Sequence, residues 1–255
     1  VLKNRSTDHY LARAGLAVGT AVIADDQTPG FDALNQPWSN SEERFKDIVL
    51  GDGRISVVHR VAENQGEPVM LYGLTDEQRK LNINEASREL LQTYLENALD
   101  LPSIETRTIA AAIVDWRDED DEPEEDGAED GYYSMQTPAY PCKDSPFQVL
   151  EELTLVKGMT PDIYRAIRDT LTVHGSGIIN INTASPDVLE FLGLDPGLVD
   201  QILRFRAGPD GIPGTPDDGV FERAGDIVKT LNDAVGLGTD EARQLRRIIR
   251  AVPLS

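Results

Sequence analysis

The chain has 255 residues, of which 45 are acidic and 24 are basic, and its formal net charge is −21. A chain of this length can bury a substantial hydrophobic core, either as one elaborated domain or as two. The negative charge argues against binding to phosphate backbones or anionic membrane surfaces, because such binding depends on basic side chains. The single Cys142 excludes an internal disulfide and a zinc site built from several cysteines.

The sequence contains no apolar run long enough to cross a membrane and no signal peptide. We therefore expect the chain as given to be soluble. Catalytic signatures are also missing from the sequence, which has no nucleophile elbow, no His-Glu-x-x-His motif and no phosphate-binding glycine loop. Three histidines have no catalytic neighbours in sequence: His9, His59 and His174. We expect no enzymatic activity.

The N-terminal segment is predicted to be a helix. Apolar side chains recur on one helical face at Leu11, Ala14, Val18 and Val22. The small residues of this segment allow neighbouring helices to approach closely, so we expect it to be a packing surface for partners. Replacing Gly15 by a large residue is then expected to weaken partner binding with little loss of stability. Residues 25–45 are expected to form a loop that Trp38 anchors on the core.

Two short strands are expected to follow the loop. Residues 51–53 (Gly-Asp-Gly) form a predicted turn, and residues 55–61 are typical of a strand. A second predicted turn at residues 66–68 leads to a partner strand at residues 69–72. The pattern predicts an α+β fold in which a long helix lies on a small antiparallel sheet.

One sequence element occurs twice. Residues 82–87 (Asn-Ile-Asn-Glu-Ala-Ser) recur as residues 180–185 (Asn-Ile-Asn-Thr-Ala-Ser). Each copy is an extended segment that ends in a serine able to cap the helix after it. A second helix and an aspartate-rich loop follow in both cases. The chain therefore contains two copies of a strand–helix–helix–loop element.

Further helices are predicted between and after the copies. Residues 145–148 (Ser-Pro-Phe-Gln) have the pattern of a capping box with proline at the first helical position. Thr160 caps another predicted helix, and residues 236–238 form a turn before an arginine-rich helix. We expect the helices between the copies to be an insertion within the sheet, between strands at residues 69–83 and 177–182. The predicted domains are 1–84 (helix and first part of the sheet), 85–176 (helical insertion) and 177–255 (return strand, second helix pair and C-terminal segment).

A loop crowded with carboxylates follows the second helix of the first copy. Ten of the thirteen residues 118–130 are acidic, and Arg117 is the basic residue nearest to them in sequence. Such charges repel one another unless a cation lies among them, and Ca²⁺ accepts irregular cages of oxygen ligands better than Mg²⁺ does. We therefore predict a structural Ca²⁺ site in residues 115–133. Its predicted ligands are Asp115, Asp118, Asp120, Glu129 and Asp130.

A weaker second site is predicted in the loop 208–219 of the second copy. Its candidate ligands are Asp210, Asp217 and Asp218. Neither loop follows the EF-hand pattern, so both predictions rest on composition and context. The alternative for the first loop is a mobile acidic linker, which is the usual meaning of a run of like charges. Its apolar entrance at residues 113–116 and its tyrosines at residues 132–133 argue against a linker.

Several motifs of the chain occur in one fixed order. They are residues 81–84, 113–120, 127–133, 138–140, 145–147, 152–160 and 179–185. In this order they resemble the K-type minor pseudopilin of bacterial type II secretion systems, over residues 8–206. The resemblance implies a pseudopilin fold, in which a long N-terminal helix lies on an antiparallel sheet that carries a large helical insertion.

The resemblance also implies a location and partners. Members of this family are held in the inner membrane by an N-terminal apolar helix, face the periplasm and bind calcium in the inserted domain. They assemble with I-type and J-type minor pseudopilins at the tip of a pseudopilus built from the major pseudopilin, and no nucleic acid is expected as a partner. Two departures stand out: the sequence lacks the apolar anchor, and residues 207–255 do not match the expected end of the sheet.

A second interpretation is a DNA-binding module. The repeated segment, its helix pair and the glycine-rich residues 235–239 also resemble the helix-hairpin-helix units of competence-type DNA receptors, which bind backbone phosphates. Four arginines give the last helix a basic character: Arg243, Arg246, Arg247 and Arg250. The acidic Asp195 in the first hairpin and the net charge of −21 argue against this interpretation.

Overall fold

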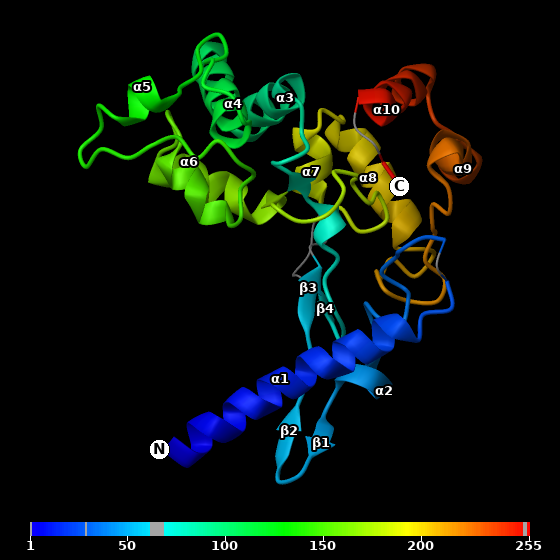
Figure 1. The fold of residues 1–255 in the computed structure, drawn as a ribbon. Coiled ribbons are helices and arrows are strands. Elements are labelled where there is room, and N and C mark those ends of the chain that lie inside the picture. Colours follow the sequence, from blue (N-terminus) through cyan, green and yellow to red (C-terminus); the bar gives the residue numbers. More distant parts are fainter. Residues whose placement is uncertain (1, 29, 62–68, 252–253) are drawn as a thin grey trace.

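A computed structural model of the chain describes residues 2–28, 30–61, 69–251 and 254–255. It has an N-terminal part, in which one long helix crosses two β-hairpins, and a larger part built almost entirely from helices (Figure 1). The α+β fold with a long helix on small antiparallel sheets confirms the prediction. Among the residues described, none of the helices combines the length and the apolar composition needed to cross a membrane.

The N-terminal part is organised around its long helix. Its elements are α1 (Leu2–Ala24), α2 (Glu42–Phe45), β1 (Ile48–Leu50), β2 (Gly53–Ile55), β3 (His59–Val61) and β4 (Val69–Leu71). Val22 packs with the predicted anchor Trp38 and with Phe45 in a small core. A Cβ on Gly19 of α1 would lie 2.9 Å from the Leu74 side chain. The glycine therefore permits the close approach.

The sheet differs in detail from the prediction. β1 pairs with β2 and β3 with β4, both antiparallel, but the two hairpins are separate two-stranded sheets. The predicted turn at residues 66–68 lies outside the described residues. In the part of the chain that the structure describes, residues 207–255 add no strand to either hairpin.

The helical part begins after β4. Its elements are η1 (Glu77–Arg79), β5 (Leu81–Asn82), α3 (Arg88–Ala98), α4 (Ser103–Arg117), α5 (Asp130–Tyr133), η2 (Leu150–Leu155), α6 (Pro161–Ile167), η3 (Arg168–Thr170), β6 (Leu171–Thr172), α7 (Pro186–Phe191), α8 (Pro196–Arg206), η4 (Ala224–Asp226), α9 (Ile227–Val235) and α10 (Thr239–Ala251). One continuous hydrophobic core joins α3 and α4 to α7 and α8. The predicted caps form, because Ser87, Thr160 and Ser185 each accept a hydrogen bond from the backbone three residues on.

The two copies of the repeat adopt the same local structure. The side chain of Asn82 accepts a hydrogen bond from the backbone N–H of Asn84 (2.9 Å), and Asn180 does the same for Asn182 (2.9 Å). These are Asx turns, in which the side chain replaces a backbone partner and bends the chain. Each turn leads into the first helix of its copy.

The second asparagine of each copy holds a distant phenylalanine. Asn84 accepts from the backbone N–H of Phe147 (2.8 Å) and donates to its carbonyl (3.0 Å). Asn182 makes the same pair of bonds with Phe221 (2.8 and 3.0 Å). We call these two contacts the asparagine clamps. They tie the start of each copy to the chain that follows its acidic loop.

An Asx turn and a clamp explain two wrong predictions. Residues 177–182 do not form a return strand, because the Asx turn at Asn180 ends the extended segment; Ile179 makes only an isolated parallel bridge with Leu254. Residues 145–148 do not open a helix, because the backbone of Phe147 is held by the clamp. The chain becomes helical only at η2, where Glu152 accepts the backbone N–H groups of residues 148 and 149.

Each copy is closed by a parallel pairing of its two ends. In the first copy Leu81 of β5 lies opposite Leu171 of β6. In the second copy Ile179 lies opposite Leu254 in the parallel bridge. The duplication inferred from residues 82–87 and 180–185 therefore extends from the first extended residues of each copy to its last.

Candidate metal centre

The acidic loop of the first copy is folded around one buried carboxylate. Asp115, near the end of α4, accepts the backbone N–H of Glu124 (3.0 Å) and that of Ala128. A Cβ built on Gly127 would overlap the Asp115 carboxylate, so a glycine is needed where the loop folds back. Asp115 therefore organises the loop through the backbone.

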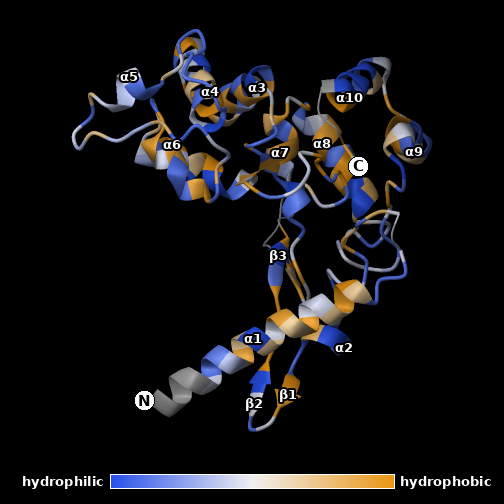
Figure 2. Cartoon of the chain, in the orientation of Figure 1, coloured by the Kyte–Doolittle hydropathy of each residue, from blue (hydrophilic) through white to orange (hydrophobic). Residues whose placement is uncertain are grey.

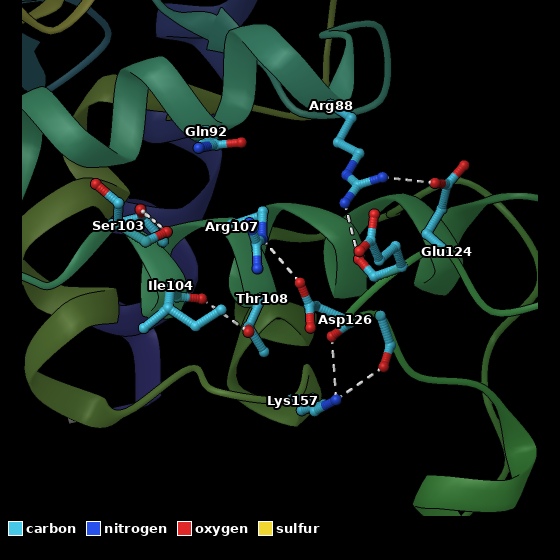
Figure 3. A network of polar contacts seen from close by, with 12 residues as sticks. Arg88, Gln92, Ser103, Ile104, Arg107, Thr108, Glu124, Asp126 and Lys157 are labelled. Carbon is cyan, nitrogen blue, oxygen red and sulfur yellow. Dashed lines mark hydrogen bonds and ion pairs between the residues drawn. The ribbon is translucent and has the colours of Figure 1, made fainter.

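Basic residues from outside the loop hold its outer side (Figure 3). Arg88 of α3 pairs with Glu124 (2.8 Å), and Arg107 of α4 pairs with Asp126 (2.7 Å). Lys157 donates to the carbonyls of Asp126 and Gly127 (3.1 and 2.8 Å). Neighbours in sequence gave no sign of these contacts, because the basic residues lie on other elements.

An aromatic cluster forms the inner side of the loop. The rings of Trp116 and Tyr133 meet edge to face with centroids 5.1 Å apart, and Tyr140 lies beside both. Trp116 and Tyr133 are buried. With the carboxylate on one side and the basic residues on the other, the loop has a defined fold and does not match a mobile linker.

A group of carboxylates whose oxygens lack hydrogen-bond partners follows the same loop. We define the acidic centre as Asp118, Glu129 and Asp144. The ligand atoms of Glu129, Asp144 and the neighbouring Cys142 lie within 4.8 Å of one another. Both carboxylate oxygens of Glu129, and one oxygen each of Asp118 and Asp144, are buried and form no hydrogen bond within the described structure. Buried carboxylate oxygens without partners are strongly unfavourable, so this arrangement needs either protons or a cation.

The electrostatics of the acidic centre lead to the same conclusion. Burial raises the pKa of Glu129 to about 7, and the nearby Asp115, Asp144 and Asp118 add to the shift. Burial raises the pKa of Asp118 to about 6, with repulsion from Asp120 as the next cause. Without a cation, the folded chain therefore holds protons on these groups near neutral pH.

The donor set favours a hard cation. Burial raises the pKa of the Cys142 thiol, and the neighbouring Glu129 carboxylate raises it further, so a thiolate is disfavoured at this position. The remaining donors are carboxylate oxygens, which suit Ca²⁺ better than Zn²⁺. The residues present thus fit Ca²⁺, and its binding stays a prediction.

The predicted ligands divide into two groups in space. Asp118 and Glu129 lie in the acidic centre, whereas Asp115 is occupied by backbone N–H groups. Asp120 is exposed and accepts the backbone N–H of Glu122 (2.9 Å). Asp130 is also exposed and accepts that of Cys142 (2.7 Å). The sequence prediction missed Asp144, which follows Cys142 closely in sequence but reaches the centre only because the chain turns back there.

The second acidic loop is held together by its own hydrogen bonds. Asp218 accepts the backbone N–H groups of Gly214 (2.7 Å) and Thr215 (3.2 Å). Asp217 accepts from the backbone N–H of Asp210 (3.2 Å) and from the Thr215 hydroxyl (2.6 Å). These three carboxylates already have hydrogen-bond partners in the protein and need no cation to satisfy them. The weaker metal site stays a prediction.

The fold, a long helix on β-hairpins followed by a large helical part, is the arrangement that the resemblance to pseudopilins implies. Residues 70–176 match the family model described as type II secretion system (T2SS), protein K. The type II secretion system protein K of Pseudomonas aeruginosa is 28% identical over 222 residues, which cover 84% of this chain and 63% of that protein. That of Klebsiella pneumoniae is 26% identical over 195 residues, which cover 70% of this chain and 54% of that protein. The chain thus spans less than two thirds of the length of either relative.

A solved structure has the same fold. It is the crystal structure of the GspK–GspI–GspJ complex from the enterotoxigenic Escherichia coli type 2 secretion system, with a TM-score of 0.69 and 19% sequence identity. The match covers 99% of this chain and 84% of that one. The resemblance inferred from the sequence is confirmed, and the chain is related to protein K of type II secretion systems.

Proposed function

We propose that the chain is the periplasmic part of a K-type minor pseudopilin. It assembles with I-type and J-type minor pseudopilins at the tip of the pseudopilus, next to the major pseudopilin. There it helps to initiate the pseudopilus and promotes secretion of proteins across the outer membrane. It works as a structural subunit, not as an enzyme, and an N-terminal anchor of the full-length protein holds it at the inner membrane.

The two faces of α1 carry this proposal. The side that meets the hairpins is covered, with Gly19 and Val22 buried. Beside this covered side, α1 exposes Leu16 (74% exposed) and Ile23 (58% exposed), which lie two helical turns apart, with the small Ala12 one turn before Leu16. An exposed apolar stripe of this kind, beside the face that the chain itself covers, suits a helix–helix contact with a partner.

The position of Gly15 corrects one expectation. A Cβ on Gly15 would lie 3.6 Å from Val57 and 3.8 Å from Ile55, so this residue faces the hairpins. A large side chain there would overlap β2 and lower the stability of the chain itself. The partner surface of α1 is therefore the Leu16–Ile23 side.

The test is co-elution of this chain with purified I-type and J-type partners in size-exclusion chromatography. The double variant Leu16→Glu with Ile23→Glu is expected to lose co-elution and keep its melting temperature, because both side chains are exposed. Val49→Glu, at an exposed apolar residue of β1, is the matched control and is expected to co-elute like the wild type. Co-elution of the double variant, or none with the wild type, would contradict the proposal.

Calcium is part of the proposal as a structural ion. The unpartnered oxygens of Asp118, Glu129 and Asp144 support one Ca²⁺ in the acidic centre, where it would replace repulsion between carboxylates by attraction to the cation. Because the ion binds the folded loop and not the unfolded chain, it would stabilise the protein by mass action.

The DNA-binding interpretation is not favoured. If the hairpin between α9 and α10 bound DNA, the backbone N–H of Gly238 would donate to a phosphate. In this structure it donates to the Glu241 carboxylate (2.6 Å). Gln201 holds the other oxygen of Glu241 (2.6 Å). A carboxylate fixed at this position repels phosphate, so the hairpin fold is used here for packing.

A further inference from the structure

The last helix carries a basic face in a chain of net charge −21. Ala242, Leu245 and Ile248 of α10 are buried against the core. On the other side four exposed arginines line a groove of about 620 Å³: Arg243, Arg246, Arg247 and Arg250. We call this the arginine face. In Figure 2, α10 carries strongly hydrophilic as well as hydrophobic residues, as expected for such a helix.

The arginines of this face are scarcely neutralised by the chain itself. Arg243 pairs with Asp240 (2.6 Å), and both side chains are largely exposed. Arg246, Arg247 and Arg250 form no ion pair with any residue that the structure describes. Like charges three and four residues apart destabilise a helix, so the arrangement lowers the stability of α10.

The corresponding helix of the first copy shows the contrast. Like α10, α6 follows a glycine-containing turn and precedes the strand residues that close its copy. The arginines of this segment are paired, Arg165 of α6 with Asp162 and Arg168 of the following η3 with Asp169. Two helices at equivalent positions thus differ in whether their guanidinium groups are left available.

We infer that the arginine face is a docking surface for a carboxylate-rich segment of another protein. The face is short, because Arg243 to Arg250 span two helical turns, or about 10 Å at the helical rise per residue. Guanidinium groups pair with carboxylates in bidentate geometry, and charge complementarity selects partners and speeds their association. A segment with acidic residues at helical spacing fits this face.

Extended polyanions fit the face less well. A nucleic acid would run beyond about 10 Å of basic surface onto a chain with 45 acidic residues, and the neighbouring hairpin N–H is already closed by Glu241. A membrane surface is disfavoured by the same net charge. The α10 helix lies at the far side of the helical part, away from α1, which crosses the hairpins (Figure 1). The arginine face is therefore separate from the α1 stripe, and each surface can be tested without the other.

The test measures binding of a fluorescein-labelled helical peptide with glutamates at i, i+4 spacing, by anisotropy at low ionic strength. The wild-type chain is expected to bind it in spite of its net charge, and added salt is expected to weaken binding. The double variant Arg246→Gln with Arg250→Gln is expected to lose at least about tenfold in affinity. Its melting temperature is expected to stay unchanged or to rise, since repulsion between like charges is relieved.

The matched control combines Arg165→Gln on α6 with Arg168→Gln at the start of η3, and it is expected to bind the peptide like the wild type. Absence of peptide binding to the wild type, or an equal loss in the α6 control, would overturn the inference. Duplex DNA and phosphatidylglycerol vesicles are measured in parallel. If either binds more tightly than the peptide and depends on Arg246 and Arg250, the occupant is a polyanion and not an acidic protein segment. None of these outcomes depends on the I-type or J-type partners, so failure here leaves the proposed assembly role intact.

Discussion

Among single residues, Asp144 and Asp120 separate a metal centre from a merely acidic loop. Both are aspartates near the first acidic loop, yet only Asp144 has a buried carboxylate oxygen without a hydrogen-bond partner. Asp120 is exposed and bonds to the backbone of its own turn. Sequence alone favoured Asp120, because it lies within the run of charges.

We predict that Asp144→Asn removes Ca²⁺-dependent stabilisation, whereas Asp120→Asn retains most of it. Saturation with Ca²⁺ at about 100 times its dissociation constant stabilises a protein by about 2.7 kcal/mol. For a chain of this size, each kcal/mol of stabilisation raises the melting temperature by roughly 2–4 °C. Thermal unfolding of each variant, with Ca²⁺ and with chelator, measures the difference. Equal Ca²⁺ responses in the two variants would remove Asp144 from the centre.

At the scale of elements, the asparagine clamps determine where the helices begin. The side chain of Asn182 is buried and forms hydrogen bonds with both the N–H and the carbonyl of Phe221. We predict that Asn182→Ala lowers the free energy of unfolding by about 1–3 kcal/mol, because it leaves a buried N–H and a buried carbonyl unpaired. Urea unfolding measures the change.

Two further variants test whether the loss of stability in Asn182→Ala comes from the clamp. Asn182→Asp keeps the acceptor for the Phe221 N–H but lacks the amide donor, and is expected to recover only part of the stability. Asn232→Ala, at an exposed position of α9, is expected to change stability little. A loss no larger for Asn182→Ala than for Asn232→Ala would show that the clamp is unimportant.

These elements also show what the sequence could predict. Helices α3, α6 and α7 follow from local signals, because each cap and its first turn lie within four residues of one another. Residues 145–148 were predicted wrongly because Asn84, far away in sequence, holds the backbone of Phe147, and residues 177–182 because the Asx turn at Asn180 ends the extended segment. Asp144 was missed because it lies outside the acidic run and joins Glu129 only in the folded chain. Composition indicated an acidic site, but only the folded chain distinguishes buried oxygens from exposed ones.

For the whole molecule, the acidic centre predicts how stability depends on pH and calcium. Glu129 and Asp118 have folded pKa values of about 7 and about 6, above those expected in the unfolded chain, near 4. Between these values the folded state binds more protons than the unfolded state. The contribution of these groups to the stability of the metal-free chain is therefore fully present below about pH 4 and is lost as the pH rises towards 7.

We therefore predict that Ca²⁺ raises the melting temperature more at pH 7.5 than at pH 5.5, since it binds the deprotonated carboxylates. Chelator is expected to lower the melting temperature at the higher pH, and excess Ca²⁺ to restore it where Mg²⁺ does so poorly. Glu129→Gln is the control, and its pH dependence is expected to be flatter. A Ca²⁺ response that is equal at both pH values, or absent, would contradict the prediction.

The parallel closure of each copy has a consequence for how the chain matures. A polypeptide that emerges N-terminus first, in synthesis or in export, presents residues 171–172 long before residue 254. The first copy can then pair β5 with β6 while the second is still incomplete. The second copy has to wait for Leu254 before Ile179 finds its partner. The two halves of one duplicated architecture are thus completed in sequence, and the half that contains the acidic centre is completed first.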